Sequence, residues 1–441
     1  MGDYSGGDYM EKKKIVIVEC ISSSANYIRD IVDEGYEPVL MELPVPEKEQ
    51  QISRIWHDLC IDEFYLSLYP DAKPPRIIRA SENYEENLEM VRELDPVLVL
   101  PGGDEGVIIA TRLSHDLGLV SNDPENLPKM RCKSVAQEML RQNGIRSIHG
   151  KTVSTLEEAL EFYQSLSSDR IVIKPIDGGA SVGVHICDDR AGLEEAFFGD
   201  IASARDRNGD SAEVLVQEYI DGDEYVVNTV SCRGVHKVTG VMVYKKILLP
   251  EMAPLYYTMS TISPESDEAR QVIDYTLKVL DAIGVEYGPV HSEIMIDEKG
   301  PVLIEANCRL CGAMMLASWQ DKVFGERESR TSLRAYLHPE RFLSDTRRIL
   351  MDAELTGIIR FLILGKEMFV RKNKVAETFS GIEGFEYAFG MGDGRLYPKT
   401  VDLSTTGGMV YLAHRSRDVL QNSLELIRKI ELEEPERIYD V

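Results

Sequence analysis

The sequence lacks any apolar run that approaches the ~20 residues needed to cross a membrane. Its longest apolar stretch, around residues 15–21, has only the length of a strand. The first ten residues are polar and acidic, without the basic and then apolar pattern of a secretory or transit leader. The seven cysteines are scattered without the spacing of a disulfide framework. These absences predict a soluble, cytoplasmic protein with reduced thiols and no membrane partner.

Positive charge is also scarce. The chain has 49 lysines and arginines against 75 aspartates and glutamates, which gives a formal net charge of −26. Such a surface repels nucleic-acid phosphates, so no nucleic-acid partner is expected. Because a nucleotide is itself an anion, any nucleotide site must supply its own lysines, arginines and backbone N–H groups.

Two common nucleotide-binding signatures are missing. No G-x-G-x-x-G opens the first predicted helix, which argues against a dinucleotide site. The glycine-rich segment at 178–183 is followed by a strand-like run, and no G-K-[ST] follows it, so it is not a Walker loop. The length of 441 residues and the ordinary composition, with 43% hydrophobic and 28% charged residues, instead predict a globular protein of two to four domains.

Strand-like and helix-like patterns alternate in the first part of the chain. A strand from Lys14 is followed by a helix with Ser24 as its N-cap and Gly35 at its end, and further strands are expected at 38–43 and 97–100. This alternation predicts a parallel, Rossmann-like lobe in an α/β fold. The serine run that contains Ser24 is interpreted as a capped turn, with contact to a ligand as the alternative.

The rest of the chain divides by its patterns into further lobes. Helices are expected at 128–142, 155–166, 190–198, 265–283 and 416–430, and β-rich sequence follows about residue 350. We therefore predict four units: a Rossmann-like domain at 13–125, a central lobe at 126–213, a catalytic lobe at 214–349 and a β-rich subdomain at 350–441.

The segment 291–309 is predicted to form a β-hairpin, because its apolar residues alternate with polar ones at the period of half-buried strands. A three-residue loop at 298–300, with Gly300 in the left-handed conformation, would pair residue 297 with residue 301. This register creates two facing pairs: Glu293 with Glu305, and His291 with Asn307.

Two carboxylates held opposite each other repel unless a cation lies between them. An all-oxygen ligand set favours magnesium, with manganese as the alternative. Magnesium usually binds one or two carboxylates together with water and substrate phosphates. The hairpin is therefore expected to form the floor of a nucleoside-triphosphate site.

Residues 171–186 form two strand-like runs joined by a glycine-rich loop. The glycines let backbone N–H groups approach an anion, a serine adds a hydroxyl, and a preceding lysine can neutralise a phosphate. The alternative is a simple turn. The residues concerned are Lys174, Gly178, Gly179, Ser181 and Gly183.

Residues 214–227 place the turn D-G-D-E between two apolar runs. The end of the first strand can offer backbone groups to an adenine edge, and Glu224 can accept hydrogen bonds from ribose hydroxyls. A hairpin with a charged turn is an equally good interpretation.

In this order, Lys133, I-K-P with G-G-A-S-V-G, Q-E-Y-I-D-G-D-E, S-E-I-M-I-D and I-E-A-N-C-R-L resemble the motifs of ATP-grasp enzymes. The N-terminal I-V-I-V-E-C-I-S-S-S and the segment L-P-G-G-D-E-G are similar to those of the L-amino acid ligases within that family. The resemblance extends over residues 14–430. The C-terminal third also resembles the closing piece of the biotin-carboxylase-like branch.

The resemblance implies an ATP-grasp fold and a role for each motif residue. It implies phosphate binding by Lys133 and Lys174 under a mobile lid at 178–183, adenine binding by Gln217, Glu218 and Ile220, ribose binding by Glu224, metal binding by Glu293, Glu305 and Asn307, stabilisation of the transferred phosphoryl group by Arg309, and a place near the substrate for His291. We leave open whether His291 is a general base or a core histidine with satisfied hydrogen bonds.

The implied activity is an ATP-dependent ligation of two amino acids through an acyl phosphate, with ATP and two divalent ions as cofactors. The alternatives are a carboxylase that uses bicarbonate and a regulatory protein that binds ATP without turnover. The expected partners are small amino acids, and a homodimer is one alternative for the assembly. The chain departs from the family in its C-x-x-C at Cys308 and Cys311, for which a redox role is disfavoured.

Overall fold

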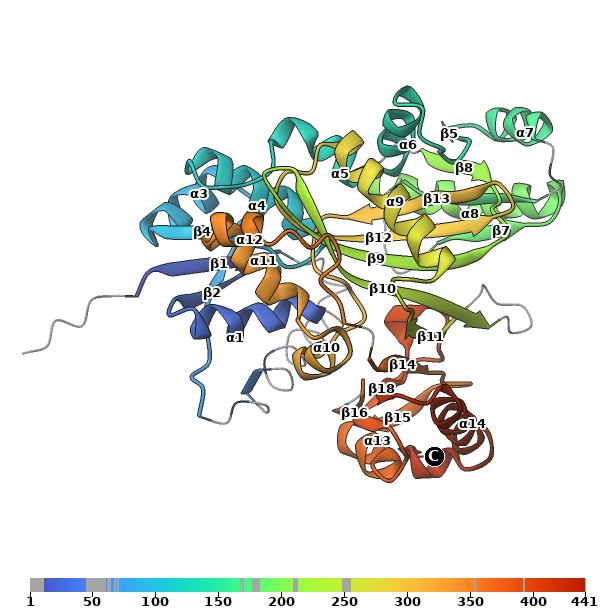
Figure 1. The fold of residues 1–441 in the computed structure, drawn as a ribbon. Coiled ribbons are helices and arrows are strands. Elements are labelled where there is room, and N and C mark those ends of the chain that lie inside the picture. Colours follow the sequence, from blue (N-terminus) through green and yellow to red (C-terminus); the bar gives the residue numbers. More distant parts are fainter. Residues whose placement is uncertain are drawn as a thin grey trace, which may run out of the picture.

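A computed structural model describes residues 12–44, 61, 65–66, 69, 71–166, 168, 170–176, 183–208, 213–247, 255–352, 354–391 and 393–440. These residues form four β-sheets with helices packed around them (Figure 1). Within the described ranges, every helix is either too short or too polar to span a lipid bilayer.

The N-terminal sheet is parallel and has the strand order β3-β2-β1-β4. Its strands are β1 (Lys14–Val18), β2 (Glu37–Glu42), β3 (Arg76–Arg79) and β4 (Pro96–Pro101). Helices α1 (Asn26–Asp33) and α11 (Glu328–Leu337) cover one face, and α3 (Tyr84–Glu93) and α4 (Asp104–Asp116) cover the other. Burial on both faces explains why β1 is apolar at consecutive positions. The predicted Rossmann-like arrangement is confirmed.

The predicted N-cap at Ser24 is wrong. Residues Ser22–Ala25 form a 3-10 turn, and α1 begins only at Asn26. The Ser24 hydroxyl donates to the carbonyl of Ile21 at 2.6 Å, which stabilises the turn rather than the helix.

A second, antiparallel sheet has the order β5-β8-β6-β7. Its strands are β5 (Gly150–Val153), β6 (Ile171–Pro175), β7 (His185–Cys187) and β8 (Val214–Glu218), and its helices are α7 (Leu156–Ser165) and α8 (Arg190–Asn208). Thr155 forms a capping box with Glu158 at the start of α7. Because β8 pairs with β6, this sheet extends beyond the proposed boundary of the central lobe at residue 213.

The largest sheet has eight strands in the order β13-β12-β9-β10-β11-β14-β18-β16. The strands are β9 (Asp223–Cys232), β10 (Val235–Ile247), β11 (Leu255–Thr261), β12 (Gly288–Asp297), β13 (Gly300–Asn307), β14 (Thr356–Leu362), β16 (Phe385–Gly390) and β18 (Gly408–His414). Helix α9 (Asp267–Ile283) buries one face against this sheet and ends at Gly284, whose φ of 77° makes the left-handed cap. Since β14, β16 and β18 extend the sheet, the proposed C-terminal subdomain shares its core with the catalytic lobe.

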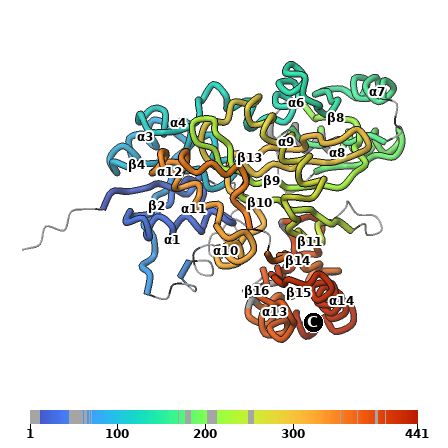
Figure 2. The backbone as a smooth tube through the Cα atoms, in the orientation of Figure 1, coloured from blue at the N-terminus to red at the C-terminus, as the bar shows by residue number. Residues whose placement is uncertain are grey.

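The remaining helices lie between and around these sheets. They are α5 (Leu127–Arg131), α6 (Lys133–Gln142), α10 (Ala317–Phe324), α12 (Pro339–Ser344), α13 (Lys372–Phe379) and α14 (Arg417–Glu433). A three-stranded sheet with the order β17-β15-β19 lies near the C-terminus and consists of β15 (Met368–Arg371), β17 (Asp393–Tyr397) and β19 (Tyr439–Asp440). Cys132 interrupts the single helix predicted at 128–142, because its extended ψ of 114° separates α5 from α6. Figure 2 traces this chain order from blue to red.

The hairpin β12–β13 has the predicted facing pairs, but the length of its loop and the register beside the loop differ from the prediction. Residue 297 pairs with Gly300 across a two-residue loop, so the predicted three-residue loop is wrong. A bulge between Glu293 and Ile294 skips one residue of β13 and restores the register. Glu293 therefore faces Glu305, as predicted. His291 likewise faces Asn307.

Candidate active site

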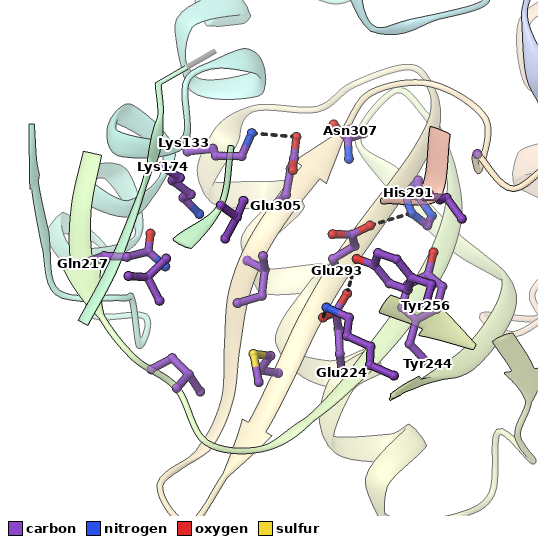
Figure 3. Close-up of a pocket in the computed structure, with 18 of the residues that line it drawn as sticks. Lys133, Lys174, Gln217, Glu224, Tyr244, Tyr256, His291, Glu293, Glu305 and Asn307 are labelled. Carbon is purple, nitrogen blue, oxygen red and sulfur yellow. Dashed lines mark hydrogen bonds and ion pairs between the residues drawn. The ribbon is translucent and has the colours of Figure 1, made fainter. Parts of the chain in front are cut away.

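A cavity of about 600 Å³ is lined by side chains of the β5-β8-β6-β7 sheet and of the eight-stranded sheet (Figure 3). The predicted site residues that line it are Lys133 at the start of α6, Lys174 on β6, Gln217 on β8, Ile220 after β8, Glu224 on β9, His291 and Glu293 on β12, Glu305 and Asn307 on β13, and Arg309 after β13. Motifs that lie as far as 176 residues apart in the sequence, from Lys133 to Arg309, thus meet in one cavity.

The two facing carboxylates each have a cationic partner of their own. Lys133 Nζ lies 3.1 Å from Glu305 Oε1, and His291 Nε2 lies 3.3 Å from Glu293 Oε1. Burial alone would raise the pKa of Glu293, but the hydrogen bond and charge of His291 hold it below its usual range. Burial raises the pKa of Glu305, and the charge of Glu293 adds to this effect against the pull of Lys133. The predicted repulsion is therefore relieved within the protein by Lys133 and His291.

Both ring nitrogens of His291 are engaged. Nδ1 lies 2.9 Å from Asn228 Oδ1, and Nε2 contacts Glu293. Burial lowers the pKa of His291, but interactions with Cys311 and Glu293 outweigh burial and raise that pKa to about 10. A buried, protonated ring with both nitrogens bonded is a poor proton acceptor at neutral pH, so the geometry favours the satisfied core histidine over the general base.

The Asn307 amide lies between two carboxylates. With its nitrogen turned toward them, it donates to Glu305 Oε1 at 2.8 Å and to Asp104 Oδ1 at 3.3 Å. To serve as a metal ligand, the amide must turn over and present its oxygen instead. This rotation is compatible with a metal that displaces the amide nitrogen from Glu305.

Arg309 is held by a residue that the sequence did not single out. Its Nε and Nη2 donate to the two oxygens of Asp104 at 3.2 and 2.9 Å. Burial would raise the pKa of Asp104, but Arg309 lowers it, with help from Arg131. Asp104 is the first residue of α4 and belongs to the segment L-P-G-G-D-E-G, so its position at a strand-to-helix turn was its one signal in the sequence.

Glu224 also has partners that sequence reasoning missed. Lys246 Nζ on β10 lies 2.6 Å from Glu224 Oε2, and the Tyr256 hydroxyl on β11 donates to Glu224 Oε1 at 3.1 Å. Burial raises the pKa of Glu224, and Lys246 opposes that shift. Lys246 and Tyr256 both line the cavity, but only the sheet register brings them beside Glu224, on β9.

Lys174 is buried on β6 with only 6% of its surface exposed. Desolvation, followed by repulsion from Lys133, lowers its pKa to about 8. A lysine so poorly solvated gains stability from an anion, which makes this part of the cavity suited to a phosphate.

The glycine-rich loop is only partly described. Gly178, Gly179 and Ser181 lie outside the described residues, whereas Gly183 has a φ of 71°, a left-handed conformation that glycine adopts without strain. Val184, the next residue, lines the cavity. The described residues that follow the loop therefore begin at the cavity.

Of the three residues proposed to bind adenine, two line the cavity and one does not. Gln217 and Ile220 line the cavity. Glu218 faces elsewhere, because its carboxylate accepts from His149 N at 2.8 Å and its own N–H donates to His149 O at 2.9 Å. The backbone N–H of Glu218 is thus already used within the protein.

Cys308 and Cys311 are both free and buried. Burial raises the pKa of Cys308 to about 12, which keeps it a thiol at neutral pH. A protonated, buried thiol is a weak nucleophile. The absence of a redox role for this C-x-x-C stays a prediction.

The donor set around the hairpin fits a cation that arrives with its substrate. Within the described part of the chain, no group of three or more histidine, cysteine, aspartate or glutamate side chains is arranged to hold a metal ion. Glu293, Glu305 and the oxygen of Asn307 can supply only part of an octahedral shell. Water and substrate phosphates would complete it, as magnesium usually requires.

Comparisons with known proteins identify a family match for the central part of the chain. Residues 168–317 match the model of the ATP-grasp domain. Dapdiamide A synthase from Enterobacter agglomerans is 27% identical over 374 residues, which cover 82% of this chain and 85% of that protein.

Solved structures show the same fold over nearly the whole chain. An L-amino acid ligase from Bacillus licheniformis aligns with a TM-score of 0.72 and 17% identity over 95% of this chain and 98% of its own. The biotin carboxylase domain of the Hydrogenobacter thermophilus 2-oxoglutarate carboxylase, a complex with MgADP, ADP and bicarbonate, aligns with a TM-score of 0.66 and 15% identity over 97% of this chain and 96% of its own. The chain is therefore similar to the ATP-grasp domain over residues 168–317, and it shares its fold with the solved L-amino acid ligase and biotin carboxylase domain over nearly its whole length.

Proposed function

We propose that the protein is an ATP-dependent carboxylate–amine ligase that joins two amino acids and releases ADP and phosphate. The observation that carries this proposal is the convergence, in one cavity, of two lysines, two facing carboxylates and an arginine. Binding of ATP alone needs no arginine beside the carboxylates. Transfer of a phosphoryl group does, because negative charge must be stabilised as it spreads over the moving group.

ATP is expected to lie along the cavity from β8 to the hairpin. Gln217 and Ile220 would meet the adenine and Glu224 the ribose, while Lys174 and Lys133 would meet the phosphates. Lys133 now pairs with Glu305, so it would exchange that carboxylate for a phosphate when a cation takes its place.

Magnesium is the expected ion, with manganese as the alternative, and we propose two ions bound by Glu293, Glu305 and Asn307. Bound there, the ions would neutralise phosphate charge and polarise the transferred group. The protein contributes the fixed spacing of its carboxylates, which the bulged register of the hairpin sets.

The reaction requires activation because a carboxylate is a poor electrophile at neutral pH. Transfer of the γ-phosphoryl group to one amino acid gives an acyl phosphate, whose phosphate can leave when the amine of a second amino acid attacks. Arg309, fixed by Asp104, would stabilise the charge on the phosphoryl group in both steps. The incoming ammonium must first lose a proton, and both ring nitrogens of His291 are already engaged, so solvent or a carboxylate is the better acceptor.

The test is a screen of amino-acid pairs with ATP and Mg²⁺ that measures phosphate release and the mass of each product. A dipeptide mass that requires both amino acids is the expected result. In Glu305→Ala, turnover should be abolished. Undiminished ligase activity in that variant would overturn the metal assignment.

The same assay separates the two alternatives. ADP release that depends on bicarbonate would favour a carboxylase. ATP binding without release of phosphate in any amino-acid mixture would favour a regulatory protein.

A further inference from the structure

The segment that follows Arg309 forms a wall of the cavity in a strained backbone conformation. Gly312 and Ala313 line the cavity together with Arg309. Ala313 and Met314 have φ values of 56° and 47°, in the left-handed region that non-glycine residues seldom adopt. Two consecutive residues of this kind persist only where surrounding contacts hold them.

The serine run after β1 supplies one set of these contacts. The hydroxyl of Ser23 donates to Gly312 O at 3.0 Å and accepts from Met315 N at 2.7 Å, so one side chain bridges both ends of the strained segment. The hydroxyl of Ser22 accepts from Met314 N at 2.9 Å. These three backbone groups of the segment thus depend on side chains nearly 300 residues earlier in the chain.

Further contacts hold the segment from other directions. The amide of Asn26 donates to Met315 O at 2.8 Å, and Gln320 on α10 donates to the same carbonyl at 2.8 Å. The hydroxyl of Tyr411 on β18 donates to Met314 O at 2.7 Å. The conformation of residues 312–315 is therefore set jointly by the 3-10 turn and α1 that follow β1, by α10 and by β18 of the eight-stranded sheet.

We infer that Ser22 and Ser23 are positioning residues that hold the 312–315 segment as the wall of the amino-acid end of the cavity. The wall adjoins Arg309 in the cavity lining. The proposed function places the phosphoryl group and the activated carboxylate beside Arg309 and the adenine at β8. Loss of these hydroxyls should therefore weaken binding of the amino acids and leave ATP binding unchanged. This inference rests on the proposed ligase function.

The test compares Ser23→Ala with Ser24→Ala. Both serines are buried in the same turn, at 3% and 1% exposure, but the Ser24 hydroxyl donates to Ile21 within the turn. Ser23→Ala leaves two buried backbone groups of the strained segment without their partner. We expect KM for the amino acids to rise about tenfold, as the loss of one buried hydrogen bond can produce, with KM for ATP within about twofold of wild type. Ser24→Ala should leave both constants near wild type.

Tyr411→Phe gives an independent variant, because it removes only the hydroxyl that holds Met314 O from the opposite side. It should raise KM for the amino acids in the same selective way, and it keeps the test decisive if Ser23→Ala does not fold. Equal amino-acid KM values in wild type and in the folded Ser23 or Tyr411 variants would overturn the inference, as would an equal rise in KM for ATP. Wild-type protein without amino-acid-dependent ADP release would instead overturn the proposed function.

Discussion

Arg309 and Asp104 form a two-point ion pair in which Nε and Nη2 donate to Oδ1 and Oδ2 at 3.2 and 2.9 Å. A guanidinium bound at two points is fixed in both distance and plane. Since Asp104 begins α4 and Arg309 follows β13, the pair connects the parallel-sheet part of the chain to the β12–β13 hairpin. The orientation of the proposed phosphoryl-stabilising group is therefore set from a separate sheet.

Asp104→Asn should impair catalysis without unfolding the protein. The amide keeps the size of the carboxylate but loses its charge and one of its two acceptors, so Arg309 can move from its position. A misplacement of about 1 Å can cost roughly 10²-fold in rate, and we expect a fall of about that size in kcat. Steady-state assays with saturating ATP and amino acids measure it.

Glu105→Gln is the matched control for that variant. Glu105 is the next residue, lies at the same helix end and pairs with Arg131 at 3.2 Å, while Arg309 is bound by Asp104. Its kcat should stay near wild type. A comparable fall in both variants would show that general charge at the start of α4, rather than the hold on Arg309, determines the rate.

Magnesium with ADP should stabilise the wild-type protein against heat. A ligand at about 100 times its Kd adds about 2.7 kcal/mol to the free energy of unfolding, which a thermal shift assay detects readily. In Glu305→Ala the increase produced by Mg²⁺ over ADP alone should disappear. An unchanged Mg²⁺ response in that variant would place the ion elsewhere.

The pH dependence of kcat/KM for ATP should reflect the loss of the proton from Lys174. Burial lowers its pKa to about 8, so the free enzyme loses this charge as pH rises through 8, and kcat/KM should fall between pH 7 and 9. A bound phosphate favours the protonated lysine, so the decline in kcat should occur at higher pH. Coincident declines in the two profiles would argue against contact between Lys174 and the nucleotide.

The same lysine affects stability with a definite sign. Between pH 8 and its ordinary value of 10.5, the unfolded chain holds a proton that the folded chain has released. The contribution of Lys174 to the free energy of unfolding therefore increases with pH through that window. Urea denaturation at pH 7.5 and 9.5 measures this effect. The free energy of unfolding of the wild type should rise relative to that of Lys174→Met from the lower to the higher pH.

Glu431→Gln should strongly destabilise the C-terminal part of the large sheet. Glu431 on α14 pairs with Arg360 on β14, with side-chain exposures of 1% and 0%, and the guanidinium stacks 3.8 Å from the ring centre of Tyr257. Removal of one charge from such a buried pair costs about 3–5 kcal/mol, because the other charge stays buried without compensation. Glu433→Gln, on the same helix but in an exposed pair 4.0 Å from Lys429, should change the urea midpoint little.

The facing of Glu293 and Glu305 was predictable because a strand alternates its faces with a period of two, which the apolar residues reveal. The loop length was not, because a three-residue loop without a bulge and a two-residue loop with one give the same facing pair. The partners Asp104 and Lys246 were also missed, as was the contact of Ser23 with Gly312, 289 residues away. Such contacts depend on how separate sheets pack, which local periodicity does not encode. The same holds for the pairing of β14 with β11, which lie on opposite sides of the boundary predicted at residue 349.

The bulge beside Glu293 also has a consequence for how this hairpin can vary in evolution. A three-residue loop without a bulge and a two-residue loop with one bring the same two carboxylates face to face. A single insertion or deletion among the exposed residues at 298–299 can therefore be absorbed along the strand before it reaches the site. The length of this loop can therefore change without a change in the spacing of the two carboxylates.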